Sequence, residues 1–227
     1  MSDYRLGIKE LDNGIAGIRK GSNIMMIGPP MSGKEYVLNH IMYHGASING
    51  NAITSVTTRE SATQFLEWFK ENKLDLPLDR IGIIDCVSKT ENENIKIASS
   101  PVDLTGIGVK ISQFFEEFSK KNIQKTQLHI NSISTILMYS NIQTVFRFLH
   151  LFTGRIKSTG GIGIYMIESG MHSEQAIATL KQLFDGIIEI EYKNDKNYIR
   201  VVGLSSKPTP WFEYEIEGAK LNIVGEK

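Results

Sequence analysis

The sequence contains very little cysteine and has no surplus of charge. Cys86 is the only cysteine among 227 residues, which excludes an internal disulfide and a zinc site built from cysteines. The 25 basic and 25 acidic residues cancel each other, so the chain as a whole has no net attraction for nucleic acid or an anionic membrane. Long apolar runs and an apolar leader are also missing, and we therefore expect a soluble, cytoplasmic protein with no membrane span.

Short apolar runs alternate with segments of helical periodicity along most of the chain. Runs typical of buried strands occur at 23–27, 51–57, 81–86, 127–133 and 161–167. Helical spacing of apolar residues occurs at 33–46, 61–72, in a segment that ends near 121, at 142–156 and at 173–184. Further strands are expected at 186–192, 198–204, 211–216 and 221–224, with a hairpin turn at 194–197. This order predicts one α/β domain over residues 1–227, with a mostly parallel sheet flanked by helices and antiparallel strands at the C-terminal end. We expect no regular structure in the lead-in at 4–22 or in the polar loop at 88–100.

A glycine-rich loop follows the first predicted strand and precedes the first long helix. Its sequence matches the phosphate-binding pattern G-x-x-x-x-G-K-[ST] at every fixed position except the last, where a glutamate replaces the hydroxyl residue. In such a loop the glycines let successive N–H groups point at phosphate oxygens, and the lysine places its ammonium between the terminal phosphates. The candidate nucleotide-binding residues are Gly28, Pro29, Pro30, Met31, Ser32, Gly33, Lys34 and Glu35.

Glu35 changes the electrostatics expected of this loop. A carboxylate near the terminal phosphates repels them unless a divalent cation lies between. The hydroxyl that normally stands at this position holds Mg²⁺. We therefore expect nucleotide binding that is weakened or has an altered dependence on Mg²⁺.

Five segments together resemble the RecA superfamily, and within it the single-domain archaeal relatives of KaiC. Residues 7–12 (GIKELD) and 28–34 (GPPMSGK) are similar to the lead-in and the phosphate loop of that family. Residues 55–61 (SVTTRES) resemble the segment that closes its second strand. Residues 128–134 (LHINSIS) resemble its Walker B strand, and 184–189 (FDGIIE) resemble the segment before its C-terminal strands. The resemblance implies a RecA-like sheet, ATP or ADP at the loop, and self-association or assembly with a related RecA-like subunit.

The resemblance also assigns roles to residues outside the loop. Glu60 matches the base that orients attacking water, although it could instead cap the helix that follows. Arg59 stands where the family has the first acidic residue of a pair, of which Glu60 matches the second. Glu168, at the end of a strand, matches a polar sensor of the nucleotide. Asn131 replaces the Walker B aspartate and contributes an oxygen without a negative charge.

Glu35 and Asn131 together form a paired change at the expected metal position. The site loses a carboxylate at 131 and gains one at 35, which preserves its net charge but not its geometry, so both are candidate ligands of an altered Mg²⁺ shell. The sequence favours a nucleotide-binding protein with weak or absent hydrolysis in a regulatory or scaffold role. Two alternatives remain open: an active Mg²⁺-dependent ATPase in DNA recombination or repair, and an interaction module with a vestigial pocket.

The remaining candidate features of the sequence have interpretations simpler than a functional role. The segments that would hold DNA-binding loops, 138–143 and 169–175, contain no lysine or arginine, which argues against DNA binding there. His172 follows a strand end, where ligand sites of α/β proteins gather, but a loop histidine without function is the simpler interpretation. His129 is expected to be a half-buried structural histidine. Trp68 is expected to be a core residue.

Overall fold

A computed structural model describes residues 4–218 and 220–227 of the chain. The strands are β1 (Asn23–Gly28), β2 (Ala52–Thr57), β3 (Ile81–Asp85), β4 (Ile95–Ile97), β5 (Thr126–Asn131), β6 (Ile162–Glu168), β7 (Gly186–Lys193), β8 (Lys196–Val202), β9 (Phe212–Glu217) and β10 (Lys220–Glu226). The α-helices are α1 (Lys9–Ile15), α2 (Lys34–Tyr43), α3 (Ala62–Glu71), α4 (Leu104–Lys120), α5 (Ile133–Tyr139), α6 (Ile142–Thr159) and α7 (Glu174–Lys181). A π-helix at His44–Ile48 continues α2, and a 3₁₀ turn at Leu78–Arg80 precedes β3.

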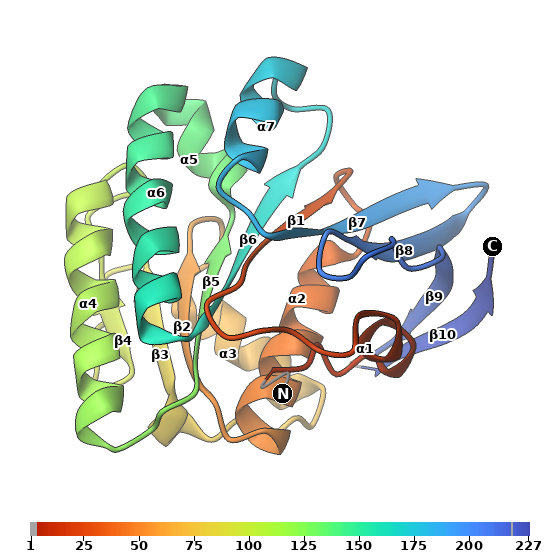
Figure 1. The fold of residues 1–227 in the computed structure, drawn as a ribbon. Coiled ribbons are helices and arrows are strands. Elements are labelled where there is room, and N and C mark those ends of the chain that lie inside the picture. Colours follow the sequence, from red (N-terminus) through yellow and green to blue (C-terminus); the bar gives the residue numbers. More distant parts are fainter. Residues whose placement is uncertain (1–3, 219) are drawn as a thin grey trace.

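The strands form one sheet in the order β10-β9-β8-β7-β1-β6-β5-β2-β3-β4 (Figure 1). The pairs from β7 to β4 are parallel, whereas β7, β8, β9 and β10 pair antiparallel. This is the predicted fold class, a mostly parallel α/β sheet with an antiparallel C-terminal extension. β1 lies between β6 and β7 and runs parallel to both. The loop that follows β1 is therefore at the carboxyl end of the parallel strands, where open α/β sheets place their ligands.

The register of the central strands positions the polar residues at this end of the sheet. Gly28, the last residue of β1, pairs with Glu168, the last residue of β6. Asn131, the last residue of β5, pairs with Thr57 at the end of β2. These strand ends therefore bring side chains from widely separated parts of the sequence to one edge of the sheet.

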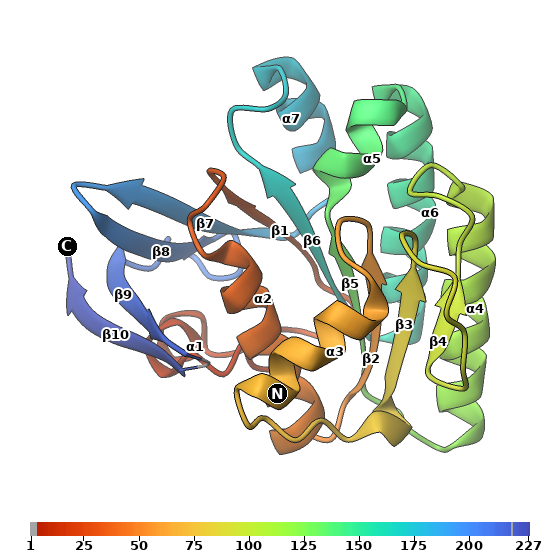
Figure 2. The same ribbon diagram turned by 180° about the vertical axis from the view of Figure 1, so that it is seen from behind.

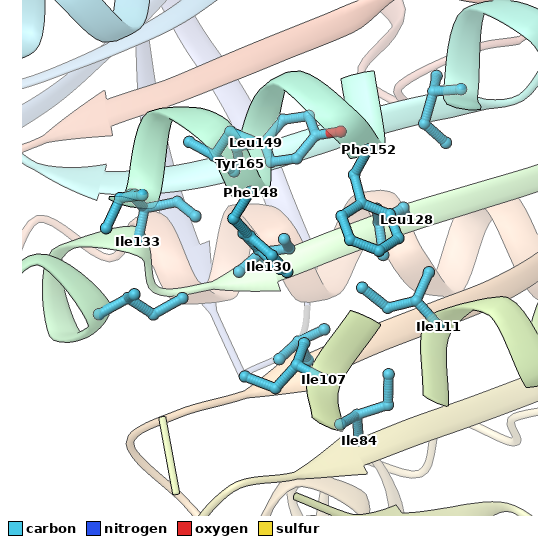
Figure 3. Packing of buried hydrophobic residues seen from close by; sticks show 14 of the residues in the cluster. Ile84, Ile107, Ile111, Leu128, Ile130, Ile133, Phe148, Leu149, Phe152 and Tyr165 are labelled. Atoms are coloured by element: carbon cyan, nitrogen blue, oxygen red, sulfur yellow. The ribbon is translucent and has the colours of Figure 1, made fainter. Parts of the chain in front are cut away.

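Helices cover both faces of the parallel part of the sheet. The largest hydrophobic cluster joins α4, α5, α6 and α7 to one face, and Figure 3 shows Phe148, Leu149 and Phe152 packed over Leu128 and Ile130. On the opposite face, seen in Figure 2, α2 and α3 pack against two further clusters. Because both faces are covered, the central strands are apolar almost throughout, as buried parallel strands are.

Three short elements differ from the sequence expectations. The lead-in at 4–22 contains the seven-residue helix α1, and the polar loop at 88–100 contains the three-residue edge strand β4. Helix α5 follows β5 and was not predicted. The other predicted strands and helices are confirmed, with boundary shifts of a few residues. At the predicted hairpin, Asn194 and Asp195 both have positive φ, 54° and 58°, as a two-residue turn between twisted antiparallel strands requires.

No helix in the described part of the chain is both long enough and apolar enough to cross a membrane.

Candidate functional site

The loop at 29–33 joins β1 to α2 and packs closely against the C-terminal strands. Gly33 has φ of 73°, and a Cβ atom there would lie 2.9 Å from Cδ1 of Ile216 in β9. A Cβ atom at Gly28 would lie 2.9 Å from Cβ of Ile190 in β7. Side chains at these positions would displace the loop, so both glycines are needed for its shape.

A buried hydrogen bond also ties the loop to β9. Tyr214 is 1% exposed, and its hydroxyl donates to the carbonyl oxygen of Ser32 at 2.9 Å. The hydroxyl of Ser32 donates in turn to the carbonyl oxygen of Pro29 at 2.8 Å. Burial raises the pKa of the Tyr214 phenol, and the nearby Glu35 carboxylate adds to the shift, so the phenol stays protonated and able to donate. Sequence analysis missed Tyr214, whose only signal was an aromatic residue in a predicted strand.

Lys34, the first residue of α2, is completely buried and surrounded by oxygens of the protein. Its Nζ atom lies 2.6 Å from Oε2 of Glu168 in an ion pair whose geometry is not that of an aligned hydrogen bond. Nζ also donates to Oε1 of Glu35 at 3.1 Å and to the carbonyl oxygen of Pro29 at 3.2 Å. A buried ammonium needs such partners, because leaving it unpaired in the interior costs several kcal/mol, on the order of 3–5.

Arg59 extends this network to the surface of the site. Its Nη1 atom lies 2.7 Å from Oε1 of Glu168 and 3.2 Å from Oε1 of Glu35. The Arg59 side chain is 51% exposed, whereas that of Glu168 is only 5% exposed. Two cations and two carboxylates therefore form a neutral group of four ionic side chains. Sequence analysis placed Arg59 near the site but did not predict this network.

A cleft of about 310 Å³ opens beside these ionic side chains. Its lining includes Glu60, Asn131, Tyr36, Asn39 and Trp68, together with Glu35 and Arg59. The side-chain Oδ1 of Asn131 is buried and has no hydrogen-bond partner among the described residues. Burial raises the pKa of Glu60, and repulsion from Glu35 raises it further, while Arg59 opposes both effects.

A larger hollow of about 960 Å³ shares Tyr36 and Trp68 with this cleft. It is lined by the loop from Pro30 to Gly33 and by residues of the C-terminal strands, among them Tyr192. The rings of Tyr36 and Trp68 have centroids 5.6 Å apart, and both residues line both hollows. Trp68 is therefore a lining residue and not only a core residue, which corrects the sequence expectation. Its partial exposure follows from its place on the edge of the amphipathic helix α3.

The structure brings most of the predicted site residues together. Lys34, Glu35 and Glu168 are in direct contact, and Glu60 and Asn131 line the adjoining cleft. Met31 lines the larger hollow from the tip of the loop, where its side chain is 97% exposed.

The alternative role for Glu60, as a helix cap, is wrong. Ser61 is the N-cap residue of α3 and forms a capping box with Gln64. Its hydroxyl accepts from the Gln64 N–H at 3.2 Å, and the Gln64 side chain accepts from the Ser61 N–H at 3.1 Å. The half-buried carboxyl group of Glu60 therefore does not cap α3 and lines the cleft instead.

His172 lies in the loop after β6, close enough to Glu168 for their charges to interact. Burial lowers the pKa of His172, and the Glu168 carboxylate opposes that shift. Its Nε2 atom has no hydrogen-bond partner in the part of the chain that the structure describes. His129, expected to be half-buried, is in fact fully buried in β5.

The donor set does not fit a metal ion held by the protein. Within 4–218 and 220–227, no group of three or more His, Cys, Asp or Glu side chains could hold a metal ion. The Glu35 carboxylate is already in contact with Lys34 and Arg59, and Asn131 offers only a neutral oxygen. Mg²⁺ prefers carboxylate oxygens in near-octahedral geometry, which these residues do not supply by themselves.

The architecture is that of the KaiC-like RecA fold. The crystal structure of a KaiC-like protein from the hyperthermophilic archaeon Pyrococcus horikoshii OT3 matches this chain with a TM-score of 0.73. The match covers 97% of this chain and 98% of that chain at 19% sequence identity. At this identity the likeness establishes the fold and leaves the activity open.

A model of a family of unknown function, DUF7504, matches residues 21–190. The chain therefore belongs to this family. None of the curated proteins matches the sequence.

Proposed function

We propose that this protein binds ATP or ADP at residues 28–35 and hydrolyses ATP weakly or not at all, in a regulatory or scaffold role. The observation that carries the proposal is the strand–loop–helix at the carboxyl end of β1, with Lys34 buried at the start of α2. The N-terminus of a helix favours anions, and the loop ends there. The hollow lined by the loop, Tyr36 and Trp68 supplies adjacent aromatic surface for the rest of a nucleotide.

Two residues, Glu35 and Asn131, support weak or absent hydrolysis. Glu35 replaces the hydroxyl residue that would hold Mg²⁺, and its carboxylate contacts Lys34 and Arg59. Asn131 replaces a carboxylate by a neutral amide. Glu60 remains a candidate base. Its raised pKa makes its carboxylate a stronger proton acceptor, so Glu60 itself does not argue against hydrolysis.

Isothermal titration calorimetry with ATP and with ADP, each with and without Mg²⁺, tests the binding part of the proposal. We expect Lys34→Ala to reduce affinity for both nucleotides by at least about tenfold, since a charge-assisted contact with phosphate is lost. Lys120→Ala is the matched control, because Lys120 is 72% exposed and pairs with Glu116 on its own helix. Equal affinities of Lys34→Ala and the parent protein would contradict nucleotide binding at this loop.

A phosphate-release assay tests the proposal that hydrolysis is weak or absent. Mg²⁺-dependent ATP hydrolysis that Lys34→Ala abolishes would overturn that proposal.

The second candidate is an active Mg²⁺-dependent ATPase that works in DNA recombination or repair. The unpartnered oxygen of Asn131 favours it: Asn131 lines the cleft, and its buried Oδ1 has no hydrogen-bond partner among the described residues, so this acceptor could serve a metal-bound water. Introducing Glu35→Thr and Asn131→Asp together discriminates between the candidates: if the double variant gains an ATPase activity that the parent lacks, the parent is not the active enzyme. The third candidate, an interaction module with a vestigial pocket, requires that neither ATP nor ADP bind tightly.

Partners and location are also proposals. Self-association or assembly with a related RecA-like subunit would suit a scaffold role, and light scattering in the presence and absence of nucleotide measures it. DNA is a poor candidate partner because residues 138–143 and 169–175 contain no basic side chain. We place the protein in the cytoplasm.

A further inference from the structure

Three oxygens of the protein surround the ammonium of Lys34, at the position where a phosphate would bind. An ammonium carries three N–H groups, and three protein oxygens lie within 3.2 Å of Nζ. One belongs to the loop itself, the carbonyl of Pro29, and the other two belong to carboxylates. A phosphate that approaches Lys34 must therefore displace Glu35, Glu168 or both.

The two carboxylates differ in how easily they can leave. The side chain of Glu35 is 34% exposed, so it can turn toward water at little cost. That of Glu168 is 5% exposed and is held at the end of β6, where its backbone N–H donates to the hydroxyl of Ser134 at 2.9 Å. Glu168 cannot reach bulk water without disturbing the strand, and it is the stronger competitor for Lys34.

Arg59 provides the second partner that Glu168 needs. It contacts Oε1 of Glu168 at 2.7 Å, whereas Lys34 contacts Oε2 at 2.6 Å. Because the two cations hold different oxygens, Glu168 can lose Lys34 and remain paired. A buried carboxylate left with no cation would be strongly unfavourable.

We propose that Glu168 competes with phosphate for Lys34 and that Arg59 permits the exchange by keeping Glu168 paired. The inference rests on the proposed function, since it concerns the affinity of the same site. It makes the site self-inhibited: Glu168 lowers affinity for phosphate, and Arg59 raises it indirectly. Arg59 and Glu168 are thus positioning residues that act through Lys34.

The competition should depend on the number of phosphates in the ligand. The lysine of a phosphate loop reaches the β- and γ-phosphates, so ATP and ADP must displace Glu168, whereas AMP does not reach Lys34. Glu168→Gln should therefore strengthen the binding of ADP and ATP and leave the binding of AMP unchanged. Arg59→Gln should weaken the binding of ADP and ATP.

Calorimetric titrations of ATP, ADP and AMP into the parent and the variants test this scheme. We expect Glu168→Gln to bind ADP at least about tenfold tighter, because a competing buried charge is removed, and Arg59→Gln to bind it about tenfold weaker. Glu189→Gln is the matched control. The Glu189 carboxylate forms an ion pair with Arg200, at 2.6 Å, and among the described residues it pairs with neither Lys34 nor Arg59. Glu35→Gln serves as a second variant with a smaller expected gain, should Glu168→Gln fail to fold as judged by circular dichroism.

The double variant Glu168→Gln/Arg59→Gln separates an indirect from a direct role of Arg59. If Arg59 acts through Glu168, the loss of affinity caused by Arg59→Gln disappears in the Glu168→Gln background. If the loss persists in full, Arg59 binds phosphate directly and this part of the scheme is wrong.

Failure of the competition and failure of the proposed function give different results. If the parent binds ADP and Glu168→Gln binds it no tighter, the competition is wrong and nucleotide binding stands. If neither the parent nor Glu168→Gln binds ADP or ATP, both are wrong. If only Glu168→Gln binds, the competition is supported in its strongest form.

Discussion

His129 shows at the scale of one residue what burial does to a titratable group. The imidazole is fully buried in β5, and its Nε2 donates to the side-chain oxygen of Gln127 at 2.8 Å. Burial lowers its pKa to about 3, because a charged imidazole would lose its hydration without gaining a counterion. The side chain is therefore neutral in the folded protein at any physiological pH.

This shift gives His129 a measurable effect on stability. The unfolded chain binds a proton near pH 6.5, and the folded chain does not until about pH 3. The folded state thus binds fewer protons within this window, and stability should decline as pH falls below about 6.5, by about 2 kcal/mol at pH 5 for this residue alone. Urea denaturation at pH 7 and pH 5 measures the change, and His129→Asn should lessen it. An identical pH dependence in the parent and His129→Asn would show that His129 does not contribute.

The residues of the candidate site were predictable only in part. The spacing of Gly28, Gly33 and Lys34 identified the loop, because phosphate-binding geometry constrains consecutive residues. The contact between Lys34 and Glu168 joins residues far apart in the chain, and no local pattern encodes it. Arg59 was located by its sequence neighbours, but its contacts depend on how β2 and β6 end at the same edge of the sheet.

At the scale of elements, length decided which helices and strands the sequence revealed. α3, α4 and α6 span 10, 17 and 18 residues, enough turns for an apolar stripe to be visible. α1 and α5 have seven residues each and β4 has three, too few to show a period. These short elements are fixed by packing against neighbours that the sequence does not identify.

The strand β9 supports the loop, and removing one hydroxyl tests that support. Tyr214→Phe leaves the buried carbonyl of Ser32 without its donor, which should lower the free energy of unfolding by about 1–2 kcal/mol. Under the proposed function it should also weaken ADP binding. Tyr139→Phe is the matched control, because Tyr139 is 68% exposed and lines neither of the two hollows. If both variants lose stability equally in thermal denaturation, β9 does not have this role.

At the scale of the whole molecule, all ten strands of the described structure belong to one sheet, against which the helices pack. The expectation of a single domain therefore predicts one cooperative unfolding transition. Phe152→Ala removes a ring that is 1% exposed and 5.0 Å from the ring of Phe148, and it should cost about 3–5 kcal/mol. Circular dichroism and tryptophan fluorescence should both report the same lowered midpoint.

The neighbouring residue supplies the control for this variant. Leu151 is 52% exposed on the same helix, and Leu151→Ala should change stability by less than about 0.5 kcal/mol. Two separate transitions in the parent, or a Phe152→Ala effect confined to one probe, would contradict a single cooperative unit.

The long stretch of chain between the loop and the β9 residues that pack against it has a consequence for synthesis. The phosphate-type loop leaves the ribosome well before Tyr214 and Ile216, which contact it from β9. Domains fold as units while the chain is made from its N-terminus, so the loop stays without this support until β9 has emerged. The family match ends at residue 190, before both of these contacts, and a nascent chain of that length would carry the motif without the surface that shapes it.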